Sequence, residues 1–275
     1  MNEVIIPNPE EFEKKKSKII SDGKENFHVV ADFDRTLTKA FVEGQKSPTT
    51  IAQIRNGNYL GEDYVEKAHE LFDKYHPFEI DPNLTIEEKR KIMKEWWDAH
   101  HNLLIDSGLT KEIINMIIAK KTLKFRGGAM EFLESLNEKG IPLVIMSAGV
   151  GPMIEGYLEQ ERRLYPSTHI ISNNYIFDEG GEMISVKGEA ITSVNKYERV
   201  VNIPETEDRK NVFLIGDGFE DLGMVEGFDY NTLIKIAFLN ENVEEQMELF
   251  KKNFDVVILG DGDFSFINEF LQQIN

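Results

Sequence analysis

The segment from Val29 to Thr38 constrains the fold most, because an apolar run ends there in two carboxylates two residues apart. Alternate side chains of an extended chain share a face, so Asp32 and Asp34 can converge where a strand passes into a loop. Two carboxylates this close are costly unless a cation or a proton lies between them. The pair therefore predicts a buried strand that ends in a site for a cation or for proton transfer.

The composition predicts a globular protein, since 275 residues with 41% hydrophobic content can form one large core and a second, smaller unit. The chain has no cysteine, so neither disulfides nor a thiolate metal site are expected. A net charge of -18 argues against binding nucleic acid polymers or anionic membranes, although a metal ion and local donors can still hold a small phosphate. With no signal-peptide core or membrane-spanning run, we expect a cytoplasmic protein. The oligomeric state stays open, and a monomer is the simplest hypothesis.

Short apolar runs alternate with helical segments such as 9–20 and 128–139. This alternation predicts an α/β fold with a doubly wound, mostly parallel sheet. The runs expected to be strands are 27–33, 141–146, 169–172, 175–177, 183–186, 212–215, 233–238 and 256–259. The fourth and fifth of these runs are joined by a glycine-containing turn and are expected to form a hairpin.

The segment 41–124 is helical in pattern throughout, without strand alternation. We therefore expect a helical cap inserted after the first strand. The predicted division is a cap of residues 41–119 and a discontinuous α/β core of residues 1–40 and 120–275.

Three of the predicted strands end in polar or glycine-rich segments: Asp32, Ser147–Gly151 and Gly216–Asp221. In an open α/β sheet the ligand lies at the carboxyl ends of the strands, so these segments are expected to meet. Each of these three segments carries residues that suit phosphoryl transfer. A carboxylate such as Asp32 can attack phosphorus, and Asp34 can move protons to the leaving group and from water.

The other groups would hold the metal and the phosphate. Asp217 and Asp221 supply oxygen ligands of the kind that Mg²⁺ prefers. Ser147 offers a hydroxyl, and the small Ala148 and Gly149 let backbone N–H groups at a helix start approach phosphate oxygens. A lysine would complete the site, and candidates lie between the second and third strand ends. These candidates are Lys187 and Lys196.

The motif Asp32–Thr38, with Ser147, a following lysine and Gly216–Asp221, resembles the haloacid dehalogenase superfamily of phosphohydrolases. Further segments are similar to the cytosolic pyrimidine 5′-nucleotidases, the type III cytosolic 5′-nucleotidases. These segments are 77–82, 95–97, 147–151, 195–196 and 234–240.

The resemblance implies Mg²⁺-dependent hydrolysis of nucleoside 5′-monophosphates, with Asp32 as nucleophile and Asp34 as acid and base. It also implies that Asp32, Asp34 and Asp217 hold the metal, that Lys196 rather than Lys187 binds phosphate, and that Thr36 and Asp221 support the site. Where the family has Ser and Gly in its last motif, this chain has Gly218 and Glu220.

The cap is expected to bind the base. On the predicted helix 85–104, Trp96 and Trp97 point about 100° apart, so Trp96 is expected to pack the cap while Trp97 and His100 face a stacking pocket. The resemblance adds Glu79 and His100 as base contacts. An acid could accept from the exocyclic amine of cytidine monophosphate or balance the cationic base of 7-methylguanosine monophosphate.

Three alternatives stay open at the level of the sequence. If Glu79 and Trp97 are structural, the chain could be a phosphatase of the same superfamily that acts on a non-nucleotide phosphoester. A phospho-accepting signalling domain also uses clustered aspartates, a hydroxyl and a lysine, but it has no use for so large an insertion. A binding protein without activity is the third alternative, although no expected site residue is missing.

Overall fold

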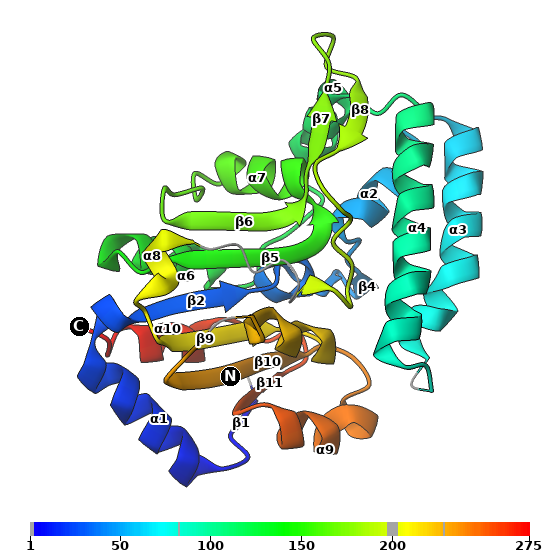
Figure 1. The fold of residues 1–275 in the computed structure, drawn as a ribbon. Helices are drawn as coiled ribbons and strands as arrows, with labels where there is room; N and C mark the ends of the chain where they lie inside the picture. The colour runs from blue at the N-terminus through cyan, green and yellow to red at the C-terminus, as the bar shows by residue number, and fades with distance from the viewer. Residues whose placement is uncertain (1–2, 82, 197–202, 228) are drawn as a thin grey trace.

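A computed structural model describes residues 3–81, 83–196, 203–227 and 229–275. Its centre is a seven-stranded sheet (Figure 1). The strands are β1 (Val4–Ile5), β2 (Phe27–Ala31), β5 (Leu143–Val150), β6 (Thr168–Asn173), β9 (Asn211–Gly216), β10 (Thr232–Leu239) and β11 (Val256–Leu259). Their order is β1-β11-β10-β9-β2-β5-β6, and among these described strands only β1 pairs antiparallel with its neighbour. The predicted doubly wound, mostly parallel sheet is confirmed.

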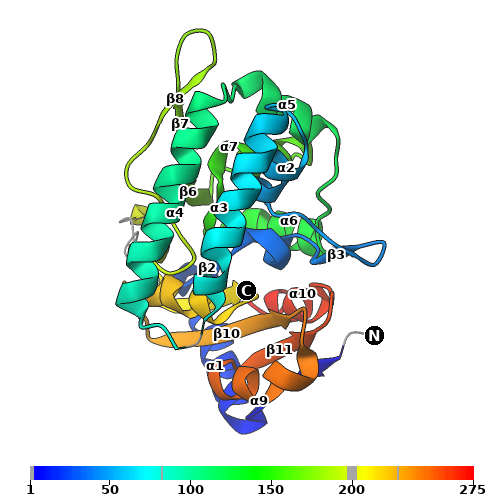
Figure 2. The ribbon, with the colours of Figure 1, turned by 90° about the vertical axis from the view of Figure 1, so that its right-hand side faces the viewer.

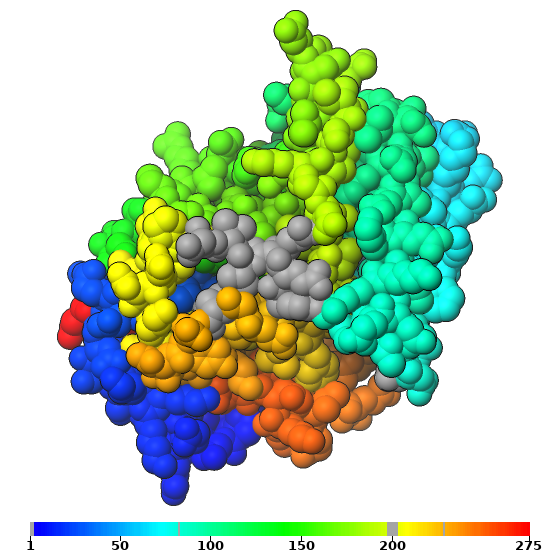
Figure 3. Space-filling model, in the orientation of Figure 1, coloured from blue at the N-terminus to red at the C-terminus, as the bar shows by residue number. Residues whose placement is uncertain are grey.

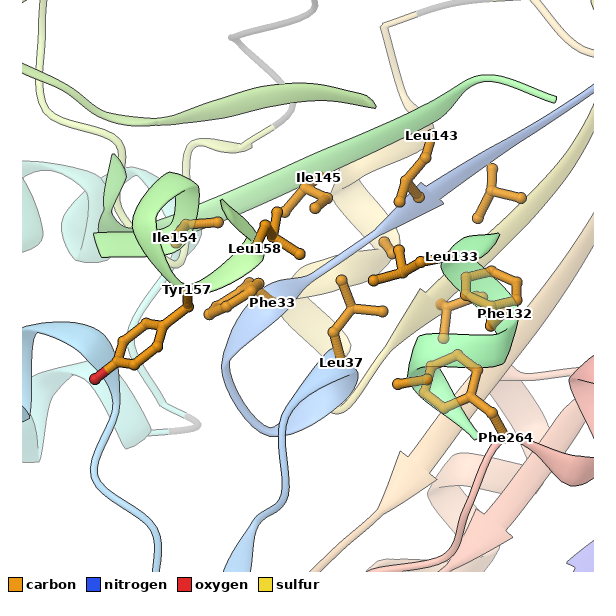
Figure 4. Close-up of a cluster of buried hydrophobic side chains, with 14 of the residues drawn as sticks. Phe33, Leu37, Phe132, Leu133, Leu143, Ile145, Ile154, Tyr157, Leu158 and Phe264 are labelled. Carbon is orange, nitrogen blue, oxygen red and sulfur yellow. The ribbon is translucent and has the colours of Figure 1, made fainter. Parts of the chain in front are cut away.

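Both faces of the sheet are buried, which explains why its strands read as continuous apolar runs. Along β2, Val29 and Ala31 contribute to one apolar cluster and Val30 to another. Figure 4 shows part of the first cluster, where Phe33 lies near Leu158 of the neighbouring helix and Phe132 lies near Phe264. The helical elements around the sheet are α1 (Pro9–Asp22), η1 (Lys24–Asn26), α6 (Ala129–Lys139), α7 (Gly151–Gln160), α8 (Pro204–Glu207), η4 (Phe219–Val225), α9 (Val243–Asn253) and α10 (Ser265–Leu271).

The insertion after β2 folds mainly into helices. Its long helices α3 (Glu62–Ile80) and α4 (Ile86–Asp106) lie side by side at one edge of the molecule (Figures 1 and 2). A capping box between Thr85 and Glu88 begins α4. The shorter helices are α2 (Thr50–Asn56) and α5 (Lys111–Ala119). The division into cap and core at residues 40 and 120 stays a prediction.

The beginning of the insertion differs from the prediction. The segment thought to be helical from residue 41 begins instead with a hairpin of β3 (Phe41–Val42) and β4 (Gln45–Lys46). Glu43 and Gly44 form its turn with positive φ angles of 53° and 76°. Strands of two residues are too short to produce a recognisable alternation. Pro82, the last residue of one family-like segment, lies outside the described residues.

The predicted hairpin is confirmed as β7 (Tyr175–Phe177) and β8 (Met183–Val186). It stands out from the sheet in Figure 1, and the space-filling view shows it next to the long cap helices (Figure 3). β8 packs against α4. Among the described residues, no helix combines the length and apolar character needed to cross a membrane.

Candidate active site

The three predicted strand ends meet, because β9, β2 and β5 are adjacent in the sheet. The Asp32 N–H donates to the Ile215 carbonyl at 2.9 Å, which ties the first strand end to the third. The second strand end differs from the prediction, since β5 continues through Ser147 to Val150 with an irregular register beyond Met146. A pocket of about 630 Å³ opens above these strand ends and reaches the cap. This volume suits a ligand larger than phosphate alone.

Lys196 lies between two buried carboxylates. Its Nζ donates to Asp32 Oδ1 at 2.6 Å and to Asp221 Oδ1 at 2.7 Å. Burial disfavours the lysine charge, but the two carboxylates outweigh this effect and raise the pKa of Lys196. Burial also raises the pKa of Asp32 well above its ordinary value, and Lys196 opposes that rise. The lysine therefore stays charged and is aimed at the expected nucleophile.

Asp221 holds this arrangement in place. Its Oδ2 accepts from the N–H groups of Asp217 and Gly218 at 2.9 and 3.1 Å. A Cβ on Gly216 would lie 2.4 Å from the same oxygen, so only glycine lets the carboxylate fold back over the end of β9. Asp221 therefore fixes the segment after β9, and its supporting role in a reaction stays a prediction.

The carboxylates are suited to a divalent cation. Oxygen atoms of Asp32, Asp217 and Asp221 lie within 4.8 Å of one another. Burial raises the pKa of Asp217 to about 7, and Asp221 adds to the rise. A metal ion would relieve this repulsion, and oxygen-only ligands match hard cations. The Asp34 side chain is not part of this group, so a metal contact from Asp34 stays a prediction.

Asp34 is instead held by Thr50, at the first turn of α2. The Thr50 N–H donates to Asp34 Oδ1 at 3.0 Å, and the Thr50 hydroxyl donates to Asp34 Oδ2 at 3.1 Å. Burial raises the pKa of Asp34 to about 6, although the Thr50 contacts lower it. A carboxyl group with this pKa can both give and take a proton near neutral pH. Sequence reasoning missed Thr50 because the insertion places it outside every motif.

The predicted phosphate-binding segment adjoins Asp34. A Cβ on Gly149 would lie 2.3 Å from the Thr50 hydroxyl and 3.0 Å from Asp34 Oδ2, so this position needs glycine. The Gly149 N–H donates to the buried Ser147 hydroxyl at 3.0 Å. Ser147, Ala148 and Gly149 all line the pocket, as does Lys196. Lys187 is exposed and does not line the pocket.

Arg126, which is almost completely buried, holds the loop after Asp32 through hydrogen bonds. Its guanidinium donates to the carbonyls of Arg35 and Thr36 and, at 3.0 Å, to the Asn240 side chain. Arg35 has a φ of 64°, an unusual value for a residue other than glycine. Thr36 is buried beside these contacts and does not line the pocket. Arg126 and Asn240 were not predicted, because a structural arginine leaves no local sequence pattern.

Glu79 lies at the cap end of the pocket, near the end of α3. Its carboxylate accepts from the Ser193 hydroxyl at 2.7 Å and lies 3.1 Å from His76 Nδ1. Burial would raise the pKa of Glu79, but these two hydrogen bonds outweigh it and hold the pKa below its ordinary value. Glu79 is therefore ionised near neutral pH. Ser193 also links the cap to the loop that carries Lys196.

The predicted aromatic residues line the same pocket. Trp97 is half-buried, with its ring centroid 5.2 Å from that of His101 and 6.4 Å from that of His100. His100 is buried beside the Tyr64 hydroxyl at 3.1 Å, and burial lowers its pKa to about 3, so it is neutral. Trp96 stacks on Tyr75 as expected for cap packing, but it also lines the pocket. Trp96 therefore combines cap packing with a place at the pocket wall, and the roles of Trp97 and His100 at the base stay predictions.

The mostly parallel sheet, with its clustered strand ends and inserted cap, has the haloacid dehalogenase-like fold. The fold matches a substrate-bound phosphoserine phosphatase with a TM-score of 0.52 at 18% identity, covering 91% of this chain and 98% of that one. A likeness this distant concerns the fold alone.

Closer matches define the family. The family model described as pyrimidine 5′-nucleotidase (UMPH-1) matches residues 35–275. The chain is 35% identical to 7-methylguanosine phosphate-specific 5′-nucleotidase A of Xenopus laevis, over 98% of this chain and 94% of that protein. The crystal structure of cytosolic 5′-nucleotidase IIIB bound to cytidine superposes with a TM-score of 0.91 at 28% identity, over 98% of this chain and 93% of that one. The chain belongs to the pyrimidine 5′-nucleotidase family, and it is a 5′-nucleotidase, a phosphoric monoester hydrolase.

Proposed function

We propose that this 5′-nucleotidase hydrolyses nucleoside 5′-monophosphates with Mg²⁺ through a phosphoryl group carried on Asp32. The observation that carries the proposal is the contact of Lys196 with Asp32 at 2.6 Å within a group of buried carboxylates. Mg²⁺ would be held by Asp32, Asp217 and Asp34, and it would neutralise charge on the phosphate. The same family assignment supports a cytoplasmic location.

In the first step, an Asp32 carboxylate oxygen attacks phosphorus and the bond from phosphorus to the 5′ oxygen breaks. Asp34 gives its proton to that oxygen, so the nucleoside leaves as a neutral alcohol. Lys196 holds a phosphate oxygen, and the Ser147 hydroxyl and the N–H groups of Ala148 and Gly149 are available for the others. Thr50 keeps Asp34 directed at the leaving oxygen.

In the second step, Asp34 takes a proton from water, and the water oxygen attacks the phosphoryl group on Asp32. The bond from phosphorus to the Asp32 oxygen breaks, and free phosphate and the original carboxylate result. Asp221 keeps Lys196 in place through both steps. One acid–base residue therefore serves both half-reactions.

The base would bind between Glu79 and Trp97. The ionised Glu79 carboxylate can balance the positive charge of a 7-methylguanine, and the Trp97 face can stack on it. The neutral His100 adds no competing charge. We therefore propose 7-methylguanosine monophosphate as the first substrate candidate. Cytidine monophosphate is the second, because its exocyclic amine can donate to Glu79.

The test measures phosphate release from 7-methylguanosine, cytidine and uridine monophosphates and from two sugar phosphates, with Mg²⁺ and then with a chelator. We expect nucleotides to be hydrolysed in preference to sugar phosphates, and the chelator to abolish the activity. Asp32→Asn serves as the inactive control. Full activity in that variant or in chelator would contradict the mechanism, and a preference for sugar phosphates would contradict the substrate class.

A further inference from the structure

Glu220 and Gly218 form a local pair at the edge of the metal site. A Cβ on Gly218 would lie 2.8 Å from Glu220 Oε2, so the absence of a side chain at position 218 makes room for the carboxylate at position 220. Glu220 is exposed, and it lines the pocket. Its acidic side chain is therefore in contact with the space that the substrate enters.

Glu220 lines the same pocket as Glu79 and directly precedes Asp221 in the sequence. Desolvation raises the pKa of Glu220, the charges of Asp221 and Glu79 add to the rise, and Lys89 opposes it. Lys89 Nζ itself donates to the Glu79 carbonyl at 2.7 Å, which places this lysine at the same junction of cap and core. Among the described residues, no side chain donates a hydrogen bond to the Glu220 carboxylate. It is thus an acceptor that remains available to a ligand.

The substrate has a fixed order of parts. In a nucleoside 5′-monophosphate the ribose connects the phosphate to the base, so a phosphate at Lys196 and a base at Glu79 leave the ribose in the middle of the pocket. The ribose edge carries two hydroxyl donors, and an ionised carboxylate only accepts. A carboxylate that accepts from ribose hydroxyls is a general means of recognising this sugar.

We propose that Glu220 recognises the ribose by accepting a hydrogen bond from its 2′ or 3′ hydroxyl. This contact would select ribonucleotides over deoxyribonucleotides. This inference rests on the proposed function, because it requires a nucleotide in the pocket. It assigns sugar selectivity to the core rather than to the cap. Glu220 is a specificity-determining residue and takes no part in the bond changes at phosphorus.

The experiment compares kcat/KM for cytidine monophosphate and 2′-deoxycytidine monophosphate, and for 7-methylguanosine monophosphate and its 2′-deoxy and 3′-deoxy analogues. We expect the wild-type chain to prefer the ribonucleotide by about tenfold or more, as a hydrogen bond to a charged acceptor implies. Glu220→Ala should bring this ratio to within about twofold of one. Glu220→Gln should keep part of the preference for the ribonucleotide, because its amide oxygen can still accept a hydrogen bond. Glu226→Ala is the matched control, because Glu226 is exposed directly after η4 and does not line the pocket.

Each other outcome overturns the inference in a recognisable way. If the wild-type chain hydrolyses ribonucleotides and deoxyribonucleotides equally well, it makes no selective contact with a ribose hydroxyl. An unchanged sugar ratio in Glu220→Ala would show that another residue makes the contact, and a changed preference among bases would place Glu220 at the base. If Glu220→Ala lowers kcat/KM equally for nucleotides and for an aryl phosphate, Glu220 acts at the metal site instead. If the wild-type chain hydrolyses no nucleotide at all, the proposed function itself fails.

Discussion

The two ends of the pocket are built from different kinds of contact. At the sheet end, main-chain N–H groups and a buried lysine hold the carboxylates, as Asp221 and Asp34 illustrate. At the cap end, aromatic rings and contacts between side chains predominate, as with Trp97 and Glu79. Groups held by the backbone keep their positions when neighbouring side chains change, whereas a pocket of side chains changes with each substitution. From this difference we propose that the core performs the chemistry and that the cap selects the base.

The largest expected effect is at the sheet end. Asp34→Asn removes the group that gives and takes the proton, so kcat should fall by about 100-fold to 10,000-fold. The loss should be similar for nucleotides and for sugar phosphates, because both need a proton on the leaving oxygen. Steady-state phosphate release with both substrates checks this. A loss confined to nucleotides would instead place Asp34 in base recognition.

Substitution of Thr50 tests how much the position of the Asp34 carboxyl group contributes to the rate. Thr50→Val removes the hydroxyl that contacts Asp34 and the Val150 N–H, and kcat should fall by about tenfold or more on all substrates. Thr50→Ser should restore most of the activity. If serine fails to rescue, the methyl group's packing rather than the hydrogen bond is the cause.

At the cap end, Glu79→Ala should raise KM for nucleotides by about tenfold, since one hydrogen bond to a charged group is lost. An aryl phosphate has no base to bind, so its KM should change little. Glu66→Ala is a suitable control on the same helix, because Glu66 is exposed and does not line the pocket. An equal rise in KM for both substrates would indicate that Glu79 only supports the structure, through Ser193 and the Lys196 loop.

The smallest effect concerns stability in acid. Burial is the main cause of the lowered pKa of three histidines, to about 4 for His28 in the core and to about 3 and 4 for His100 and His101 in the cap. Below the unfolded pKa of about 6.5 the unfolded chain binds protons that the folded chain does not, so stability is complete above that pH and falls as the pH drops toward 4. Each histidine contributes a slope of up to about 1.4 kcal/mol per pH unit.

Urea unfolding between about pH 7 and about pH 5 measures this slope. His28→Gln should reduce it, and His69→Gln, which changes an exposed histidine, should leave it unchanged. A slope that stays the same without His28 would contradict the assignment for the core.

The same comparison explains what the sequence could predict. The strands of the core are short apolar runs, and their ends carry motifs with fixed spacing, so Asp32, Ser147 and Asp217 could be brought together from the order of the strands alone. The bend of β5 could not be predicted, because Ser147–Val150 continues a strand in a segment that reads as a turn. Thr50 and Arg126 were missed because their roles depend on contacts across the fold rather than on local pattern.

The cap was harder to interpret because helical periodicity does not say what a helix faces. Trp96 and Trp97 point in different directions on α4, yet both line the pocket. Trp96 packs on Tyr75 and borders the pocket at once. Lys196 could be chosen over Lys187 only through the family resemblance, since both lie between the same two strand ends.

The most direct test of the division between chemistry and selection is the ratio of kcat/KM for 7-methylguanosine monophosphate to that for ribose 5-phosphate, whose leaving oxygen also needs a proton. It is measured in the wild-type chain, in Trp97→Ala and in Thr50→Val. Trp97→Ala should lower the ratio by about tenfold while the sugar phosphate activity is kept. Thr50→Val should lower both activities without changing the ratio. An unchanged ratio in Trp97→Ala, or an equal change in both variants, would contradict this division.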